Sequence, residues 1–152
     1  YAPGGSRSFG PTLGRIRRDD YIDWARDNVA VIPMIETREA VDNLPDILAV
    51  PGIDAVYVGP ADLSLTLGLP PANNDGETSF DEAYATIVAA CTEAGVVPGC
   101  HANGPLTPRR FTQGFRMVTA TTDQLAVAAG AQIALDAARS DRAGDDTGGA
   151  LY

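Results

Sequence analysis

The chain has 152 residues, of which 45% are hydrophobic and 20% are charged, a composition typical of one globular domain with a core of its own. Its formal net charge of −9, with no basic cluster longer than RIRR at 15–18, argues against nucleic acid and anionic membranes as partners. No hydrophobic run approaches the roughly 18–20 residues that span a bilayer, and the first ten residues do not resemble a signal peptide. The two cysteines, Cys91 and Cys100, predict no disulfide framework and lack metal-site spacing, so we expect a cytoplasmic protein.

The chain opens at Tyr1 in a stretch rich in glycine and proline, and residues 1–17 are expected to form a loop. A short helix should follow over 19–29, capped by one of two aspartates and with Trp24 anchored in the core. No strand precedes this helix, which indicates a sequence that begins partway through a fold.

Four hydrophobic segments have the composition of buried parallel strands, and a segment with helical spacing follows each of them. The predicted strands cover about 30–35, 54–58, 96–100 and 115–120. The first of them contains Pro33, which has no N–H to donate and therefore makes regular pairing there less favourable.

The helices between these strands have recognisable ends. Thr37 is expected to cap the helix after the first strand, and Pro45 should divide that helix in two. Ser79 and Glu82 form a capping box for a long amphipathic helix that ends at Gly95. Further helical segments are predicted after Gly59-Pro60, from a Thr107 cap to Gly114, and over about 122–139.

Strands that alternate with helices pair in parallel, and four β/α units are half of a (β/α)₈ barrel, which typically needs about 250 residues. We therefore predict an α/β fold of the TIM-barrel type, with a partial barrel domain over residues 1–139 and a flexible C-terminal tail over 140–152. Such a half barrel would leave two sheet edges and a hydrophobic inner face uncovered. Either it is a fragment, or it closes with another half, or the sheet is open; a chain standing alone should form a homo-oligomer.

Two acidic residues, Glu36 and Asp62, stand directly after the first two predicted strands. Because the carboxyl ends of neighbouring parallel strands meet at one edge, we expect these side chains to converge where α/β folds bind ligands. Two carboxylates without a basic residue in the motif favour a hard cation, Mg²⁺ or Mn²⁺, with positions left for water and substrate. The alternative is that each acid caps the helix that follows it.

The sequence Gly59-Pro60-Ala61-Asp62 offers a second feature at the same edge. Backbone N–H groups of Ala61 and Asp62 begin a helical turn and could hold a carboxylate. Gly59 would let a substrate approach the backbone closely.

His101, the only histidine, ends the third predicted strand at this edge. It could transfer protons or orient a substrate, or it could be a half-buried loop residue held by hydrogen bonds. Arg7, Arg109 and Arg110 could meet anions but are expected to be solvated. Cys100 should face away from His101, so we expect no thiol–imidazole pair.

Several stretches together resemble the HpcH/HpaI aldolase family of the phosphoenolpyruvate/pyruvate barrel superfamily. They are YAPGGSRSFGP at 1–11, IPMIETREAVDNLPDIL at 32–48, PGIDAVYVGPADLSLTLG at 51–68 and GFRMVTATTD at 114–123. The resemblance runs from Tyr1 to about Arg139 and implies the C-terminal half of the barrel. It also implies a class II aldolase, which cleaves or forms a C–C bond in a 4-hydroxy-2-oxo acid to give pyruvate and an aldehyde.

In this resemblance Glu36 and Asp62 would be the metal ligands, and the backbone of Ala61 and Asp62 would hold the pyruvate carboxylate. The N-terminal SRSFG loop would lie near the site, and family members are generally oligomers that exchange the last helix. The catalytic histidine and arginine of the family come from early barrel strands that are absent here, and the resemblance does not carry those roles over to His101 or Arg7. His101 matches a pattern seen in some relatives and is kept as a candidate catalytic residue on that ground. Met34 stands where many members have a glutamine that contacts the substrate. Two alternatives are a malyl-CoA or citrate-lyase-like enzyme and a non-catalytic half-barrel binding module.

Overall fold

The structure is a computed structural model that describes residue 10 and residues 17–144, with side chains described up to residue 139. The loop expected over 1–17, including the SRSFG segment and Arg7, therefore lies almost entirely outside the described residues. The same holds for the tail beyond residue 144, and the predicted domain boundary at 139 stays a prediction. Within the described residues, no helix is long and apolar enough to cross a membrane.

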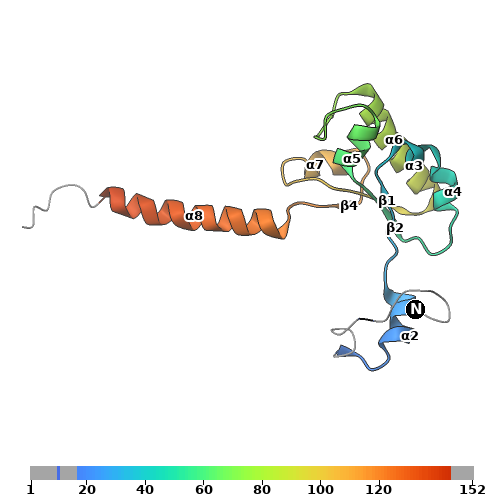
Figure 1. The fold of residues 1–152 in the computed structure, drawn as a ribbon, viewed down its shortest axis with the longest axis horizontal. Helices are drawn as coiled ribbons and strands as arrows, with labels where there is room; N and C mark the ends of the chain where they lie inside the picture. The colour runs from blue at the N-terminus through green and yellow to red at the C-terminus, as the bar shows by residue number, and fades with distance from the viewer. Residues whose placement is uncertain (1–9, 11–16, 145–152) are drawn as a thin grey trace, which may run out of the picture.

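Four parallel strands make up the sheet found within the described residues, and they lie side by side in chain order (Figure 1). They are β1 (Met34–Ile35), β2 (Ala55–Val58), β3 (Val97–Cys100) and β4 (Met117–Val118). Helices follow each strand, so each β/α unit advances the sheet by one position, as in half of a (β/α)₈ barrel. The predicted α/β architecture is confirmed.

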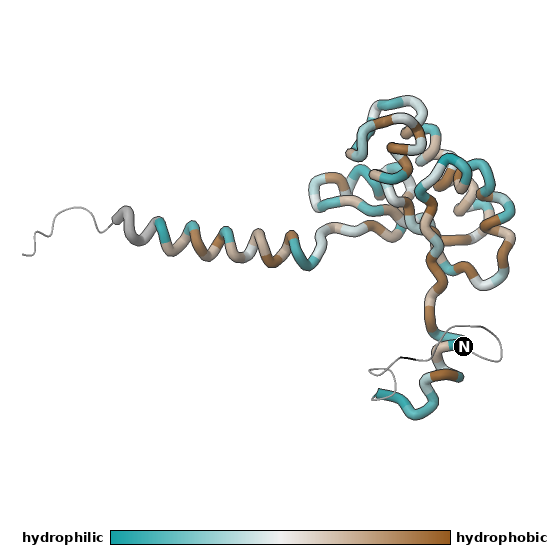
Figure 2. Tube along the Cα trace, in the orientation of Figure 1, coloured by the Kyte–Doolittle hydropathy of each residue, from teal (hydrophilic) through white to brown (hydrophobic). Residues whose placement is uncertain are grey.

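The strand β1 is shorter than the predicted segment 30–35, and Pro33 is the physical reason. Since Pro33 has no N–H, it cannot donate to the ladder, although its carbonyl accepts from Tyr57 N at 2.9 Å. Before Pro33, the segments that lead into β1 and β2 are still joined by a hydrogen bond. Val31 N donates to Asp54 Oδ2 at 2.8 Å. The segment that joins α2 to β1 is hydrophobic along its length (Figure 2) and largely exposed.

The helices largely follow the sequence signals. They are α2 (Tyr21–Asn28), α3 (Arg38–Asp42), α4 (Leu44–Leu48), α5 (Pro60–Thr66), α6 (Thr78–Ala94), α7 (Thr107–Thr112) and α8 (Asp123–Gly144). Thr37 caps α3 by accepting from Ala40 N at 3.0 Å, and Pro45 lies in the first turn of the separate helix α4. Gly95 ends α6 with a φ of 70°, in the left-handed region that glycine adopts without strain.

Three predicted helix ends are wrong. The helix α6 begins at Thr78, so Ser79 lies inside it, and Asp81 instead reaches back to accept from Gly76 N at 3.1 Å. Thr107 is the first residue of α7 rather than its cap, because Asn103 Oδ1 already accepts from Leu106 N at 3.1 Å just before the helix. The helix α8 continues to Gly144, five residues beyond the predicted end.

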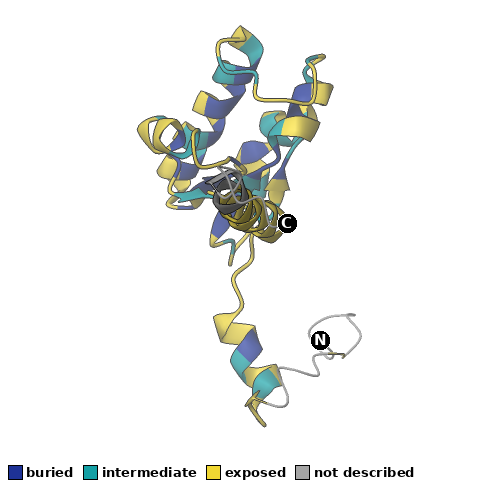
Figure 3. Ribbon diagram, turned by 90° about the vertical axis from the view of Figure 1, so that its left-hand side faces the viewer, coloured by how far each residue is buried: buried dark blue, intermediate teal, exposed yellow. Residues whose placement is uncertain are grey.

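The core lies between one face of the sheet and the helices packed on it, where the buried residues are concentrated (Figure 3). The sheet contributes Ile35, Val56, Val58 and Cys100, and α6 contributes Phe80, Ala83, Tyr84, Ile87 and Cys91. The prediction that Trp24 lies in this core is wrong, because α2 extends away from the sheet (Figure 1). Trp24 instead lies near Tyr21, with ring centroids 6.2 Å apart.

No described helix packs on the opposite face of the sheet, as expected for the inner face of a partial barrel. Along each strand the residues alternate between the two faces, so this inner face carries Met34, Tyr57, Gly99 and Met117 in one register row. Met34 is 51% exposed and Val97 is 40% exposed. Functional side chains on this face are therefore open to a ligand.

Candidate functional site

The carboxyl-terminal edge of the sheet collects one residue from each strand in a single row. The last paired residues are Ile35, Val58, Cys100 and Val118, which share a register. The next residues along the four strands form what we call the edge row: Glu36, Gly59, His101 and Thr119. Backbone hydrogen bonds continue the pairing into this row, from Gly59 N to Ile35 O at 3.3 Å and from His101 N to Val58 O at 3.0 Å. Because Ile35, Val58 and Cys100 face the helices, the edge row belongs to the inner face.

Glu36 lies directly against Gly59. A Cβ atom built on Gly59 would be 2.8 Å from Glu36 Oε2 and 3.2 Å from Met34 Cε. The Glu36 carboxylate therefore leans over the backbone of the neighbouring strand end, in space that only a glycine leaves free. The next residues after Gly59 begin α5, the helix that carries Asp62, so the backbone of both acids lies at this end of the sheet.

The alternative that these acids are helix caps is wrong for both. Thr37, not Glu36, caps α3, while Asp62 is the third residue of α5 and makes no side-chain cap bond. Among residues 17–144, neither Glu36 nor Asp62 forms an ion pair, and no described group donates a hydrogen bond to either carboxylate. Both carboxylates are thus available for a cation.

Two side chains hold the turns that carry the acids. Thr66 Oγ1 accepts from Arg38 N at 3.1 Å and donates to Leu63 O at 2.9 Å, which ties the start of α3 to α5. Ser64, fully buried, donates to Pro60 O at 2.6 Å and accepts from Asn74 Nδ2 at 2.7 Å. These bonds fix both turns relative to each other.

The first turn of α5 also presents two backbone donors. Its first intrahelical bond runs from Leu63 N to Gly59 O at 3.0 Å. Pro60 has no N–H, and the N–H groups of Ala61 and Asp62 precede the helix ladder, so they point out of the helix start. Both residues are exposed.

His101 contacts Tyr57, which in turn contacts Thr119, and the sequence predicted neither contact. The Tyr57 hydroxyl lies 3.1 Å from His101 Nδ1 and also contacts Thr119 Oγ1. The sequence does contain a weak signal, because Tyr57 and Thr119 are polar-tipped residues at inner-face positions of otherwise apolar strands. No described hydrogen bond or ion pair joins His101 to Glu36 or Asp62.

Cys100 is separate from this site, as predicted. It is fully buried among the helix-facing residues, and burial raises the pKa of its thiol to about 11. A thiol with such a pKa stays protonated at neutral pH and is a poor nucleophile.

The prediction that Arg110 is solvated is wrong. Arg110 is buried, donates to Asp75 Oδ1 at 2.8 Å and to Asn73 Oδ1 at 2.6 Å, and lies 4.9 Å from the centre of the Tyr84 ring. Burial alone would raise the pKa of Asp75, but the hydrogen bonds from Arg110 and Asn73 outweigh it and hold that pKa below its usual value. Arg109, which is half-exposed, also pairs with Asp75 at 3.2 Å.

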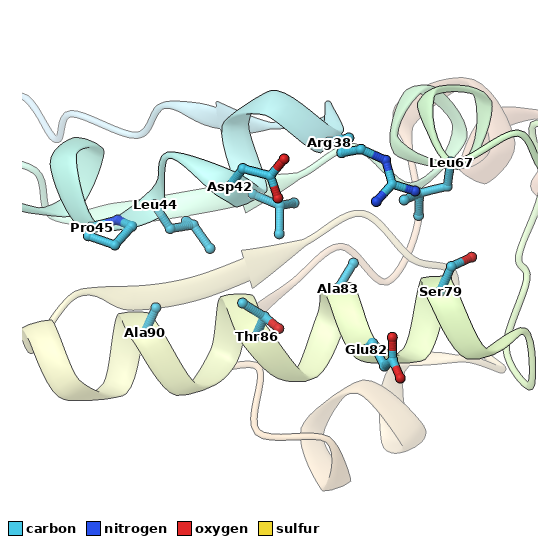
Figure 4. A pocket seen from close by; sticks show the side chains of 11 residues that line it. Arg38, Asp42, Leu44, Pro45, Leu67, Ser79, Glu82, Ala83, Thr86 and Ala90 are labelled. Atoms are coloured by element: carbon cyan, nitrogen blue, oxygen red, sulfur yellow. The ribbon is translucent and has the colours of Figure 1, made fainter.

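A groove of about 450 Å³ lies between α3, α4 and α6 on the helix side of the sheet (Figure 4). Arg38, Asp42 and Glu82 line it together with small and apolar residues, and the Arg38 side chain extends along it toward Leu67. None of the edge-row residues lines this groove. It therefore does not belong to the candidate site.

The donor set fits a divalent cation with few protein ligands. No group of three or more His, Cys, Asp or Glu side chains suited to a metal occurs among the described residues. A cation at Glu36 and Asp62 would thus have two carboxylate ligands and would take its remaining ligands from water or a bound molecule. Mg²⁺ in particular is commonly held by one or two carboxylates while keeping several waters.

Residues 1–133 match the family model described as HpcH/HpaI aldolase/citrate lyase. The chain is 39% identical over 137 residues to 4-hydroxy-2-oxo-heptane-1,7-dioate aldolase of Salmonella paratyphi C, covering 87% of this chain and 51% of the relative. It is 37% identical over 142 residues to hydroxypyruvate/pyruvate aldolase of Rhizorhabdus wittichii, covering 92% of this chain and 57% of the relative.

Among solved structures, an HpcH/HpaI aldolase/citrate lyase family protein from Burkholderia cenocepacia superposes with a TM-score of 0.70 at 32% identity, over 91% of this chain and 55% of that protein. The chain thus spans about half the length of the curated relatives it matches.

Proposed function

The chain belongs to the HpcH/HpaI aldolase/citrate lyase family, and on that premise we propose that it supplies the metal and substrate site of a class II aldolase. The reaction is cleavage or formation of a C–C bond in a 4-hydroxy-2-oxo acid, with pyruvate and an aldehyde as the other reactants. The observation that carries this proposal is a pair of carboxylates, Glu36 and Asp62, at one edge of a parallel sheet, neither of which has a partner among residues 17–144. Relatives named as aldolases of a 4-hydroxy-2-oxo acid and of pyruvate support the substrate class.

Glu36 and Asp62 are the proposed ligands of a divalent cation, Mg²⁺ or Mn²⁺. Glu36 is held over Gly59 with its Oε2 on the site side, and Thr66 ties the turns that carry both acids. A cation bound there would act as a Lewis acid toward the substrate carbonyl and would stabilise the negative charge that develops as the C–C bond breaks.

The N–H groups of Ala61 and Asp62 are the proposed site for the carboxylate of the oxo acid. Two free donors at a helix start favour an anion, and Gly59 beside them leaves room for close approach. Met34 closes the other side of this position, with its Cε near Gly59. A thioether donates no hydrogen bond, so Met34 shapes the oxo-acid position by contact alone.

This chain offers no residue for the other common aldolase chemistry. A Schiff-base aldolase needs a lysine amine as its nucleophile. All eleven basic residues of this chain are arginines, so a carbonyl substrate held here has no lysine partner within it. The metal route therefore suits these residues better.

His101 is the proposed proton-transfer or substrate-orienting residue of this half of the barrel. It is the only imidazole in the chain, it is exposed, and it shares the edge row with Glu36. Its Nδ1 is engaged by Tyr57 at 3.1 Å, which leaves Nε2 as the atom that faces a ligand.

A CoA-dependent lyase is the less favoured alternative. Such an enzyme needs cationic side chains for the CoA phosphates. Arg109 and Arg110 are both paired with Asp75, and Arg38 lines the groove on the helix side. The described part of the chain therefore shows no cluster of available arginines at the edge row.

We also propose that the protein forms a homo-oligomer. The helix α8 projects from the sheet (Figure 1), and four large hydrophobic side chains on it are more than half exposed: Leu125, Val127, Ile133 and Leu135. A lone chain would leave these and the inner face of the sheet in water.

Two measurements on the 152-residue chain test the metal proposal. Isothermal titration with Mn²⁺ should show binding that Glu36→Gln or Asp62→Asn weakens at least tenfold. Glu93→Gln, at an exposed position of α6, is the matched control and should bind as the unchanged chain does. Exchange of the pyruvate methyl protons in D₂O, followed by NMR, then reports whether this half alone promotes enolisation. Unchanged Mn²⁺ affinity in both site variants would refute the ligand assignment.

A further inference from the structure

Tyr57, His101 and Thr119 form a hydrogen-bonded cluster across three neighbouring strand ends. Tyr57 comes from β2, His101 directly follows β3 and Thr119 directly follows β4. The Tyr57 hydroxyl lies between the other two, 3.1 Å from His101 Nδ1 and in contact with Thr119 Oγ1. The Tyr57 and His101 rings meet edge-on, with centroids 6.4 Å apart and planes at 73°. We call these three residues the Tyr57–His101–Thr119 cluster.

The cluster lies beside the proposed metal site on the same face and edge. His101 and Glu36 occupy the edge row on β3 and β1, two strand spacings apart, which corresponds to about 10 Å between their backbones. Gly59 stands between them and has no side chain. The Glu36 carboxylate and Met34 Cε extend over Gly59 from the β1 side. The imidazole of His101 stands on the β3 side.

The surroundings of the cluster on the inner face are apolar. Met34, Val97 and Met117 share this face, and Met117 covers Gly99, where a Cβ would lie 2.5 Å from Met117 Cε. A ligand extending along the inner face from the metal site would thus meet carbon and sulfur atoms except at the cluster. Among the described residues on this part of the inner face, the cluster is where a polar group on that ligand can find hydrogen-bond partners.

The hydrogen-bond chain leaves His101 Nε2 for a ligand. If Tyr57 donates to Nδ1, Thr119 can donate to Tyr57, and Nε2 carries the proton. If Nδ1 carries the proton, Tyr57 donates to Thr119, and Nε2 becomes an acceptor. Because the hydrogen bonds of the cluster can run in either direction, His101 can donate to or accept from a hydroxyl group of the ligand. In both cases it keeps its hydrogen bond to Tyr57.

We propose that the Tyr57–His101–Thr119 cluster is a specificity-determining site that selects an aldehyde bearing a hydroxyl group over an aliphatic aldehyde of the same size. This inference rests on the proposed aldolase function, since the aldehyde is the partner of pyruvate. An aliphatic aldehyde would displace solvent from His101 Nε2 and the Tyr57 hydroxyl. It would not replace the hydrogen bonds that these groups make with water. A hydroxyl replaces them.

A hydroxyl fits this cluster better than a second carboxylate. Arg109 and Arg110 are paired with Asp75, and Arg38 lines the groove on the helix side (Figure 4), so these three guanidinium groups are engaged away from the cluster. A carboxylate placed there would lose its hydration without gaining a cationic partner from these arginines. A neutral hydroxyl carries no such cost.

The single histidine makes the test direct. In the ¹⁵N-labelled 152-residue chain, one pair of imidazole nitrogen signals reports on His101. We would titrate glycolaldehyde and propanal, which differ by one hydroxyl in place of a methyl group, in the presence of Mg²⁺ and pyruvate. With no lysine in the chain, side-chain amines do not react with the aldehydes. Glycolaldehyde should shift the Nε2 signal at a concentration about tenfold below that needed for propanal, as one additional hydrogen bond provides.

Two variants test the hydroxyl groups of the cluster, and a third variant is the control. Tyr57→Phe and Thr119→Val each remove one hydroxyl while keeping the size of the side chain, and either should reduce the preference for glycolaldehyde to less than threefold. Tyr21→Phe, on α2, is the matched control and should keep the full preference. Far-ultraviolet circular dichroism checks that each variant is folded, and Thr119→Val serves if Tyr57→Phe is not.

Two outcomes would overturn the inference. The first is an equal response to the two aldehydes in the unchanged chain. The second is a preference that survives in both hydroxyl variants. Failure of the aldolase proposal is seen separately, because Mn²⁺ binding and pyruvate proton exchange are measured without any aldehyde and depend on Glu36 and Asp62.

Discussion

Replacing Gly59 with alanine should disrupt the proposed metal site while leaving the fold intact. The new methyl carbon would lie 2.8 Å from Glu36 Oε2 and 3.2 Å from Met34 Cε, and comfortable contacts between heavy atoms begin near about 3.5 Å. The Glu36 oxygen must therefore retreat by about 0.5 Å or more. Metal–oxygen distances in such sites are held to within about 0.2 Å, so the shift is large for a ligand.

The cost to stability should be modest, because the closest displaced atoms are the ends of two flexible side chains and only Glu36 Cβ, at 3.2 Å, is fixed to the backbone. Gly59 has a φ of −91°, which alanine adopts without strain. Alanine also restricts the unfolded chain, which offsets part of the clash, and the net change in the free energy of unfolding should stay within about 1 kcal/mol.

Calorimetric titration with Mn²⁺ and urea unfolding are the two measurements. We expect Gly59→Ala to raise the Kd for Mn²⁺ at least tenfold with a nearly unchanged unfolding midpoint. Gly104→Ala is the matched control, because the nearest atom to its new carbon is Ala120 O at 3.8 Å. Unchanged Mn²⁺ binding in folded Gly59→Ala would refute the placement of Glu36 as a ligand.

Two further predictions concern stability and assembly. The pKa of Asp75 is held below its ordinary value of about 3.9. The interaction of Asp75 with Arg110 should therefore stabilise the fold above that pH and be lost as the pH falls below it. The free energy of unfolding by urea should differ less between pH 7 and pH 3.5 in Asp75→Asn than in the unchanged chain. An equal difference in both proteins would contradict this reasoning. Light scattering after size exclusion should show a dimer or larger assembly, and Val127→Glu with Ile133→Glu should shift it toward the monomer, because both residues are 72% exposed hydrophobic residues on α8. A stable monomer of the unchanged chain would contradict the oligomer.

The local signals in the sequence were reliable where one turn or one helix end decides the structure. Thr37 caps its helix, Pro45 begins a new one, and Gly95 ends α6, because each effect involves residues within one turn of the chain. The capping box at Ser79 and Glu82 was wrong because Asp81 bonds to the preceding loop through Gly76. Pro33 shortened β1 as its missing donor indicated.

The order of strands and helices, and the positions of Glu36, Asp62 and His101 after strands, could be predicted from the amino-acid pattern alone. Hydrophobic periodicity and turn residues act over a few positions, so they can be read without a structure. The metal and catalytic roles of these residues stay predictions.

Which side chains contact one another became evident from the packing of the strands. The register of the parallel strands places Glu36 over Gly59 and joins Tyr57 to His101 and Thr119, which are 44 and 62 positions away along the chain. The same is true of Arg110 and Asp75, 35 positions apart, whose pairing buries a charge that the sequence pattern assigned to solvent. Register depends on how whole strands and helices pack together, and a shift of one residue would move each side chain to the other face of the sheet.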